Sequence, residues 1–183
     1  MARPSDGTAQ AVLDLLLARP ATLGAGRLLS IDGPSGSGKT VLADAVAGLV
    51  PGARVVHVDD LVPGWDGLPE VAAHLDVLLR PLASGRAGSY PRYDWVSGGP
   101  GGTVQVEPAP LLVVEGVGAG APSVADLVTL LVWVDADEDV RRARGIERDG
   151  ETYRAYWERW AAAEQVLFAE HGNRARADLV VRT

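Results

Sequence analysis

Apolar residues along this chain occur in two patterns: short continuous runs, and longer stretches with helical spacing. The continuous runs predict buried β-strands at residues 27–32, 54–60, 111–116, 128–135 and 177–181. Helical spacing predicts helices at residues 6–18, 40–50 and 70–82, the last stopped by Pro81, and a long charged helical region at about 136–171. Because helices fall between most of the strands, the pattern predicts an α/β fold: a doubly wound, five-stranded parallel sheet with helices on both faces.

The length of 183 residues is that of one domain, so a single domain spanning residues 1–183 is expected. The one long stretch without a regular pattern covers about residues 84–110. It contains the segment YPRYDWVSGGPGG (90–102), in which aromatic rings run directly into glycines. A packed core has little use for the glycines, and a flexible linker has little use for the rings. This insert is therefore a candidate for a specific role.

Composition and charge restrict the function classes. No apolar run approaches the roughly 20 residues of a membrane-spanning helix, and the first ten residues do not resemble a secretory signal, so a cytoplasmic protein without a membrane partner is expected. The net charge of −7 argues against a nucleic-acid partner. With no cysteine and three scattered histidines, any metal should be bound by oxygen. Whether the chain forms a homo-oligomer is left open.

The segment GPSGSGKT fits the phosphate-binding pattern G-x-x-x-x-G-K-[ST] in full, and it lies between a predicted strand and a predicted helix. Backbone N–H groups of such a loop form a concavity for phosphate oxygens, and the start of the helix adds positive potential. The motif predicts binding of a nucleoside triphosphate with Mg²⁺ through Gly33, Pro34, Ser35, Gly36, Ser37, Gly38, Lys39 and Thr40. Lys39, the only lysine of the chain, is expected to reach the β- and γ-phosphates, and the Thr40 hydroxyl to contact Mg²⁺.

Other nucleotide-binding classes are less compatible with the sequence. A signalling GTPase needs an Asn-Lys-x-Asp motif, and the single asparagine, Asn173, lies far from Lys39. The segment VSGGP (96–100) superficially matches the signature of transporter ATPases, but a proline and two glycines follow where a helix should begin. A kinase for a small acceptor, or an ATPase that uses water, remains.

Acidic residues follow three of the predicted strands, where the ligand of an open parallel sheet lies. They are Asp59 and Asp60, Glu115, and Asp135 with Asp137. A carboxylate there can take the proton of an acceptor hydroxyl or hold Mg²⁺. The alternative is helix capping, which fits the segment DADED (135–139) particularly well.

The long charged helix carries Arg141, Arg144 and Arg148 on one face, which could present guanidinium groups to phosphates or could be a solvated surface. An aromatic row follows them and is expected to be core packing or a wall of the acceptor pocket: Tyr153, Tyr156, Trp157 and Trp160. His57 is expected to be a buried strand histidine.

In order and spacing, four motifs resemble the uridine kinase-like P-loop kinases, a group that includes nicotinamide riboside, pantothenate and phosphoribulo kinases. The motifs are VDDL (58–61), PRYDWVS (91–97), VVEG (113–116) and RARGIERD (142–149). The resemblance extends over about residues 27–181. It implies a P-loop NTPase fold with an acceptor-side hairpin in the insert at 84–110 and a helical lid at about 141–160.

The same resemblance assigns roles to individual residues. Asp59 is implied as the catalytic group that receives the hydroxyl proton, and the metal site as Thr40 and Glu115 with Asp59 beside them. Lys39, Arg144 and Arg148 would stabilise the transferred phosphoryl group, with Asp149 completing the lid motif. The acceptor would contact Asp59, Tyr93, Asp94 and Arg148.

The activity implied is transfer of the ATP γ-phosphoryl to a hydroxyl of a small, nucleoside-like acceptor, most like uridine kinase. Uridine kinases continue the acceptor hairpin with a His-Ser-Arg sequence, whereas this chain has Gly98, Gly99 and Pro100. Another acceptor, such as nicotinamide riboside or pantothenate, is therefore an alternative, and so is a regulatory P-loop ATPase without a small-molecule acceptor.

Overall fold

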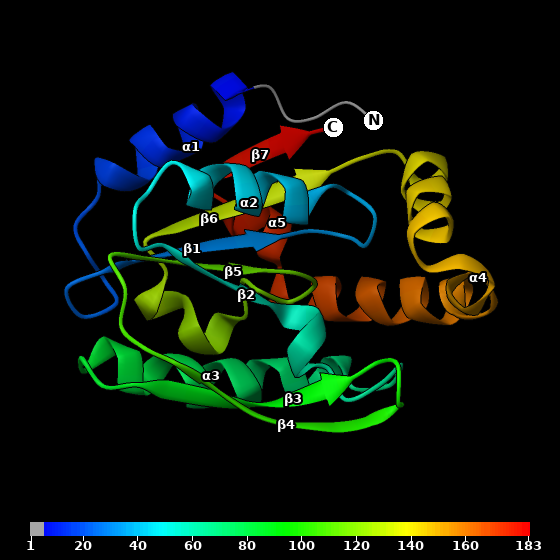
Figure 1. Cartoon of the computed structure of the whole chain (residues 1–183). Helices are drawn as coiled ribbons and strands as arrows, with labels where there is room; N and C mark the ends of the chain where they lie inside the picture. Colours follow the sequence, from blue (N-terminus) through cyan, green and yellow to red (C-terminus); the bar gives the residue numbers. More distant parts are fainter. Residues whose placement is uncertain (1–5) are drawn as a thin grey trace.

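A computed structural model describes residues 6–183, except for the side chains of residues 6, 152 and 153. Its centre is a five-stranded, all-parallel sheet with the strand order β2-β5-β1-β6-β7 (Figure 1). The strands are β1 (Arg27–Asp32), β2 (Arg54–His57), β5 (Leu111–Glu115), β6 (Leu130–Asp135) and β7 (Leu179–Arg182). The predicted α/β fold with a five-stranded parallel sheet is thereby confirmed.

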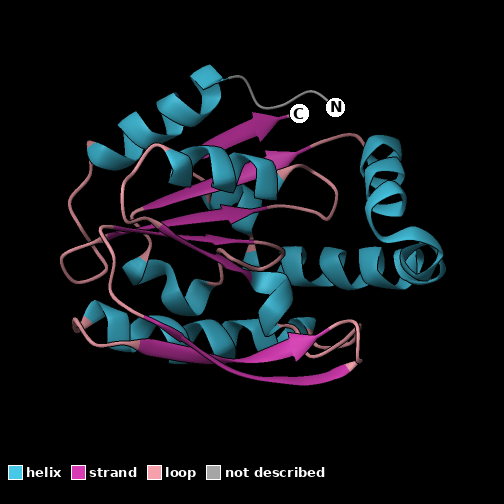
Figure 2. Cartoon of the chain, viewed as in Figure 1, coloured by secondary structure: helices cyan, strands magenta, loops and turns pink. Residues whose placement is uncertain are grey.

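Helices cover both faces of this sheet (Figure 2). The helices are α1 (Asp6–Leu17), α2 (Lys39–Gly48), α3 (Val71–Ala83), α4 (Glu138–His171) and α5 (Asn173–Arg176), with short 3₁₀ turns at Val58–Leu61, Leu68–Glu70 and Pro122–Leu127. Successive side chains of a strand point to opposite faces. Leu28 thus joins the apolar cluster under α3, and Leu29 joins the cluster under α1 and α2. Burial on both faces explains why the strands read as continuous apolar runs.

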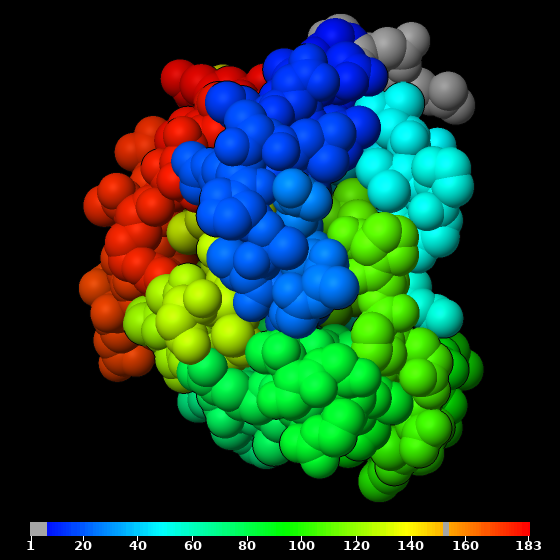
Figure 3. Space-filling view, turned by 90° about the vertical axis from the view of Figure 1, so that its left-hand side faces the viewer, coloured from blue at the N-terminus to red at the C-terminus, as the bar shows by residue number. Residues whose placement is uncertain are grey.

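The insert, which lacks a regular apolar pattern, is an antiparallel hairpin of β3 (Gly88–Asp94) and β4 (Gly99–Val106), as the family resemblance implied. Tyr90 and Val106 are buried in the cluster that contains α3, so the hairpin is anchored by its own apolar residues. Figure 3, which views the molecule from the left-hand side of Figure 1, shows α1 (dark blue) and, below it, the green segments of α3 and the hairpin. Glycine and proline interrupt the alternation of apolar and polar residues in both strands, so the apolar pattern alone did not predict them.

Two further element predictions need correction. The strand expected at 54–60 ends at His57, and Val58–Leu61 forms a 3₁₀ turn. This turn places Val58 and Leu61, three residues apart, on the same buried side. Pro81 does not stop α3, which continues to Ala83. Leu82 is buried in the core, and a proline in the last turn removes little hydrogen bonding.

Helix α4 consists of two segments that run in different directions, drawn yellow and orange in Figure 1. The break lies at Gly150, whose φ of 71° and ψ of −152° are not helical. Side chains other than hydrogen strongly disfavour this conformation. The glycine thus lets the segment before it cross the carboxyl ends of the strands, while the segment after it packs on the core through Trp160 and Leu167.

Candidate active site

The phosphate-binding motif forms the loop between β1, the central strand of the sheet, and α2. Gly38 is the residue before α2 and has a φ of 94°. Because glycine has no side chain, none caps the first N–H groups of the helix at this position. Lys39 is 7% exposed, and its Nζ donates to the Pro34 carbonyl at 3.0 Å. Open helix N–H groups beside a lysine form a site suited to an anion such as a nucleotide phosphate.

The first segment of α4 lies directly against this loop. A Cβ atom on Gly36 would fall 2.3 Å from the carbonyl oxygen of Arg141, and Gly36 has a φ of 76°. The Arg141 guanidinium donates to the Ser35 carbonyl at 3.3 Å, and that of Arg144 to the Gly36 carbonyl at 3.4 Å. Only a glycine at position 36 permits this approach of the two backbones.

A cavity of about 430 Å³ opens above the loop and brings together most of the residues expected at the phosphates. Its lining includes Lys39, Thr40, Asp59, Glu115, Arg144 and Arg148. These six side chains come from four separate segments of the chain, so the fold assembles what the sequence contained only as scattered motifs.

Glu115, at the end of β5, connects the residues that could bind a metal ion. Its Oε1 accepts hydrogen bonds from Thr40 Oγ1 at 3.1 Å and from His57 Nδ1 at 2.6 Å. Burial opposes the charged form, but the His57 hydrogen bond and the charge of Lys39 prevail and lower the pKa of Glu115. Conversely, the hydrogen bond to Glu115 raises the pKa of His57. The expectation of a buried His57 is wrong, since its side chain is 43% exposed.

Thr40 and Glu115 provide a hydroxyl and a carboxylate oxygen, the ligand types that Mg²⁺ prefers. Within the described part of the chain, no group of three or more His, Asp or Glu side chains could hold a metal by itself. The donor set thus fits an ion that takes one or two protein ligands and completes its shell with phosphate oxygens and water.

Asp59 lies in the 3₁₀ turn after β2 and is exposed to the cleft. The protein around it reduces hydration of the carboxylate, and Glu115 repels its charge, so that the pKa of Asp59 is raised. A carboxylate that accepts a proton more readily than usual is suited to act as a base toward a hydroxyl. Its neighbour Asp60 is turned toward Arg92 of the hairpin, at 3.7 Å.

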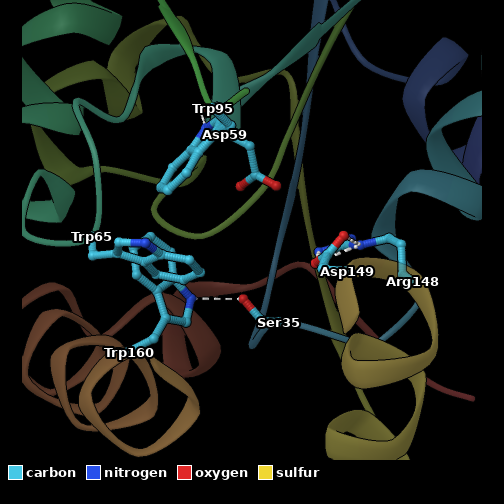
Figure 4. Close-up of a pocket in the computed structure, with 7 residues that line it drawn as sticks. All are labelled: Ser35, Asp59, Trp65, Trp95, Arg148, Asp149 and Trp160. Carbon is cyan, nitrogen blue, oxygen red and sulfur yellow. Dashed lines mark hydrogen bonds and ion pairs between the residues drawn. The ribbon is translucent and has the colours of Figure 1, made fainter. Parts of the chain in front are cut away.

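A second cavity, of about 480 Å³, adjoins the first and shares Ser35, Asp59 and Arg148 with it. Figure 4 shows Trp65 and Trp160 on one side of this cavity, Arg148 with Asp149 on the other, and Asp59 next to Trp95. Its lining consists of Ser35, Asp59, Trp65, Trp95, Arg148, Asp149 and Trp160. Trp65 and Trp95 were not expected from the sequence, in which single tryptophans in loops give no signal of a common site.

The hairpin residues expected at the acceptor lie next to this cavity rather than among its lining residues. Tyr93 contacts Trp95 edge to face, with 5.1 Å between the ring centroids. Asp94 accepts hydrogen bonds from Val96 N at 2.9 Å and Ser97 Oγ at 2.8 Å, and these bonds lower its pKa. Both residues thus shape the turn that presents Trp95.

The remaining sequence candidates are engaged elsewhere. Asp135 pairs with Arg174 at 3.4 Å, and Asp137 pairs with Arg182 at 3.1 Å. In the aromatic row of α4, Tyr156 stacks on Trp65. Trp157 and Trp160 of the same row are buried, and the side chain of Tyr153 lies outside the described residues.

Two buried carboxylates were not anticipated. Asp32, at the end of β1, accepts hydrogen bonds from the N–H groups of Gly33, Gly118 and Gly120 and from the amide of Asn173. Glu164 of α4 accepts from Ser35 N at 2.9 Å and Trp160 Nε1 at 2.8 Å. Both carboxylates hold loops of the site in place. In the sequence, each was recognisable only as an acidic residue within an apolar stretch.

The fold and these cavities define a P-loop protein of the α/β class, with the first segment of α4 packed against the phosphate loop and a second pocket beside it. Residues 71–170, more than half of the chain, match the family described as the Phosphoribulokinase / Uridine kinase family. The chain belongs to this family.

Individual relatives agree with the assignment. A uridine kinase of Borrelia turicatae is 25% identical over 138 residues, covering 67% of this chain and 67% of its own. An inorganic pyrophosphatase of Arabidopsis thaliana is 29% identical over 138 residues, but these are only 20% of that protein. A solved structure described as "a Possible Uridine Kinase from Bacillus stearothermophilus" shares the fold over 96% of this chain and 97% of its own, with a TM-score of 0.65 and 22% identity.

Proposed function

We propose that this protein is an ATP-dependent kinase, acting as one domain, that transfers the γ-phosphoryl group of ATP to a hydroxyl of a small, nucleoside-like acceptor. One observation carries the proposal: Asp59 lines both the cavity above the phosphate loop and the cavity walled by tryptophans. A phosphate donor in the first and a hydroxyl acceptor in the second would therefore meet at this carboxylate.

The proposed reaction needs positioning and charge stabilisation more than covalent chemistry. Asp59 accepts the hydroxyl proton while the acceptor oxygen bonds to the γ-phosphorus and the bond from that phosphorus to the bridging oxygen of ADP breaks. Lys39, Arg144 and Arg148 balance negative charge on the phosphate oxygens. Mg²⁺, bound through Thr40 and Glu115 with Asp59 beside them, would supply further charge neutralisation.

The acceptor is not assigned to uridine, because the hairpin continues with Gly98, Gly99 and Pro100. Nicotinamide riboside and pantothenate stay in the set of candidates. Within the described part of the chain, no helix has the length and hydropathy needed to cross a bilayer.

The test is ADP release by the purified protein, with and without a panel of nucleosides, vitamins and amino alcohols, together with mass spectrometry of the products. The proposal expects at least one acceptor to raise ADP release above the rate with water and to gain one phosphoryl group. A rate that no acceptor raises would instead favour the regulatory ATPase.

A further inference from the structure

Three tryptophans from distant segments form one corner of the acceptor-side cavity. Trp65 follows the 3₁₀ turn after β2, Trp95 lies in the hairpin turn, and Trp160 is on α4. The angles between the ring planes are 71° for Trp65 and Trp95, 87° for Trp65 and Trp160, and 84° for Trp95 and Trp160. The corresponding centroid distances are 5.0, 5.7 and 6.5 Å. Three nearly perpendicular indoles thus meet at a corner (Figure 4).

Two of these indoles direct their N–H groups into the protein. Trp95 Nε1 donates to the Asp59 carbonyl at 2.9 Å. Trp160 Nε1 donates to Ser35 Oγ at 2.9 Å and to Glu164 Oε1 at 2.8 Å. What these two side chains offer a ligand is therefore the electron-rich surface of the ring rather than a hydrogen-bond donor.

The charged side of the cavity has an excess of carboxylate. Arg148 is bound to Asp149, with 2.6 Å between Nη2 and Oδ2, so these two charges offset each other. Asp59 adds a further negative charge. No asparagine or glutamine is among the seven lining residues, so no side-chain amide is present to read the hydrogen-bonding edge of a neutral base.

Aromatic surfaces attract cations through the ring quadrupole, and nearby carboxylates strengthen that preference. We propose that the tryptophan corner formed by Trp65, Trp95 and Trp160 selects an acceptor with a positively charged head group. Binding of the head group in this corner holds the hydroxyl of the acceptor toward Asp59. This assignment of the substrate class rests on the proposed kinase function for its meaning, but binding alone can test it.

The test compares two alcohols of nearly the same shape, choline and 3,3-dimethylbutan-1-ol, which differ in a nitrogen cation replaced by a neutral carbon. Their binding to the protein is measured by calorimetry and by tryptophan fluorescence. Hydrophobic burial favours the neutral alcohol, so a preference for the cation reports the aromatic and carboxylate charges. We expect choline to bind at least about tenfold more tightly.

Replacing Trp95, which is 36% exposed, by leucine keeps an apolar side chain but removes one ring surface. W95L should lose most of the preference for choline, whereas W133F, a change of a buried tryptophan that packs on Phe168, should retain it. Equal or tighter binding of the neutral alcohol to the unaltered protein would overturn the proposal, and so would a failure of choline to bind.

The outcome is separable from the kinase proposal. If the cation preference is found but no acceptor raises ADP release, the corner stands and the kinase function fails. If a neutral acceptor is phosphorylated and choline shows no preference, the kinase function stands and the cation selection fails.

Discussion

The carboxylate of Glu164 accepts a hydrogen bond from the backbone N–H of Ser35, 129 residues earlier in the chain, at 2.9 Å. The same oxygen accepts the indole N–H of Trp160, which in turn lines the acceptor-side cavity. Glu164 therefore joins the phosphate loop to a wall of the acceptor pocket. Because Glu164 is 3% exposed, the Ser35 N–H that it binds would otherwise lose hydration without replacement.

Replacing Glu164 by alanine should leave the Ser35 N–H without this acceptor. We expect a loss of about 1–3 kcal/mol in the free energy of unfolding, together with weaker binding of an ATP analogue. Urea denaturation and calorimetric titration measure the two effects. Glu158, exposed on the same helix, provides the control: E158A should change neither quantity appreciably, and equal effects of the two substitutions would contradict the role of Glu164.

Asp59 is expected to act on the acceptor rather than on ATP. D59N removes the proton acceptor while keeping the size of the side chain, so turnover should fall at least about 100-fold with an ATP-analogue affinity close to that of the unaltered protein. The measurement pairs ADP release in the presence of the active acceptor with analogue binding. Turnover near normal would exclude Asp59 from the mechanism.

The sequence contained most of the fold and the phosphate half of the site. Apolar runs identified β1 and β5 closely because their two-sided burial leaves no polar alternation to misread. The motif at residues 33–40 was readable since its function depends on neighbouring backbone atoms, which are local in sequence.

The acceptor half was only partly readable. Trp65 and Trp95 face the same cavity because a loop and a hairpin turn meet in three dimensions, and neither lies in a periodic pattern. Asp32 looked like the end of a strand, and only its four donors, from two loops and from Asn173, reveal it as a buried anchor. Such long-range contacts have no local signature.

His171 should make stability depend on pH. Burial lowers its pKa, Arg176 lowers it further, and the charges of Asp32 and Glu170 act in the opposite direction; its Nδ1 is buried without a hydrogen-bond partner in the described structure. In the unfolded chain the pKa is about 6.5, so the unfolded state binds the proton first as the pH falls. Above about pH 6.5, His171 is neutral in both states and does not change the free energy of unfolding. As the pH falls below about 6.5, protonation of the unfolded chain makes the folded state less stable.

Urea denaturation of H171Q and of the unaltered protein, at intervals between about pH 8 and pH 5, isolates this contribution. The stability of H171Q relative to the unaltered protein should rise as the pH falls through the window below about 6.5, and it should be constant above it. A stability difference that is independent of pH, or one that changes in the opposite direction, would contradict the assignment.

Gly150 should control how the lid helix meets the phosphate loop. Alanine at this position would make the observed conformation, with its φ of 71°, less favourable by about 1–3 kcal/mol. Alanine also favours a helix that continues without a break. A straight α4 could not keep its second segment packed on the core and also keep Arg144 on the Gly36 carbonyl. G150A should therefore bind an ATP analogue several-fold more weakly and expose the amides of the phosphate loop to faster hydrogen exchange.

Gly48, near the end of α2, gives the matched control, because its φ is not positive and a Cβ there meets nothing within 4 Å. G48A should be neutral or slightly stabilising, with unchanged analogue binding. If G150A were as harmless as G48A, the break at Gly150 would have no part in closing the lid over the nucleotide.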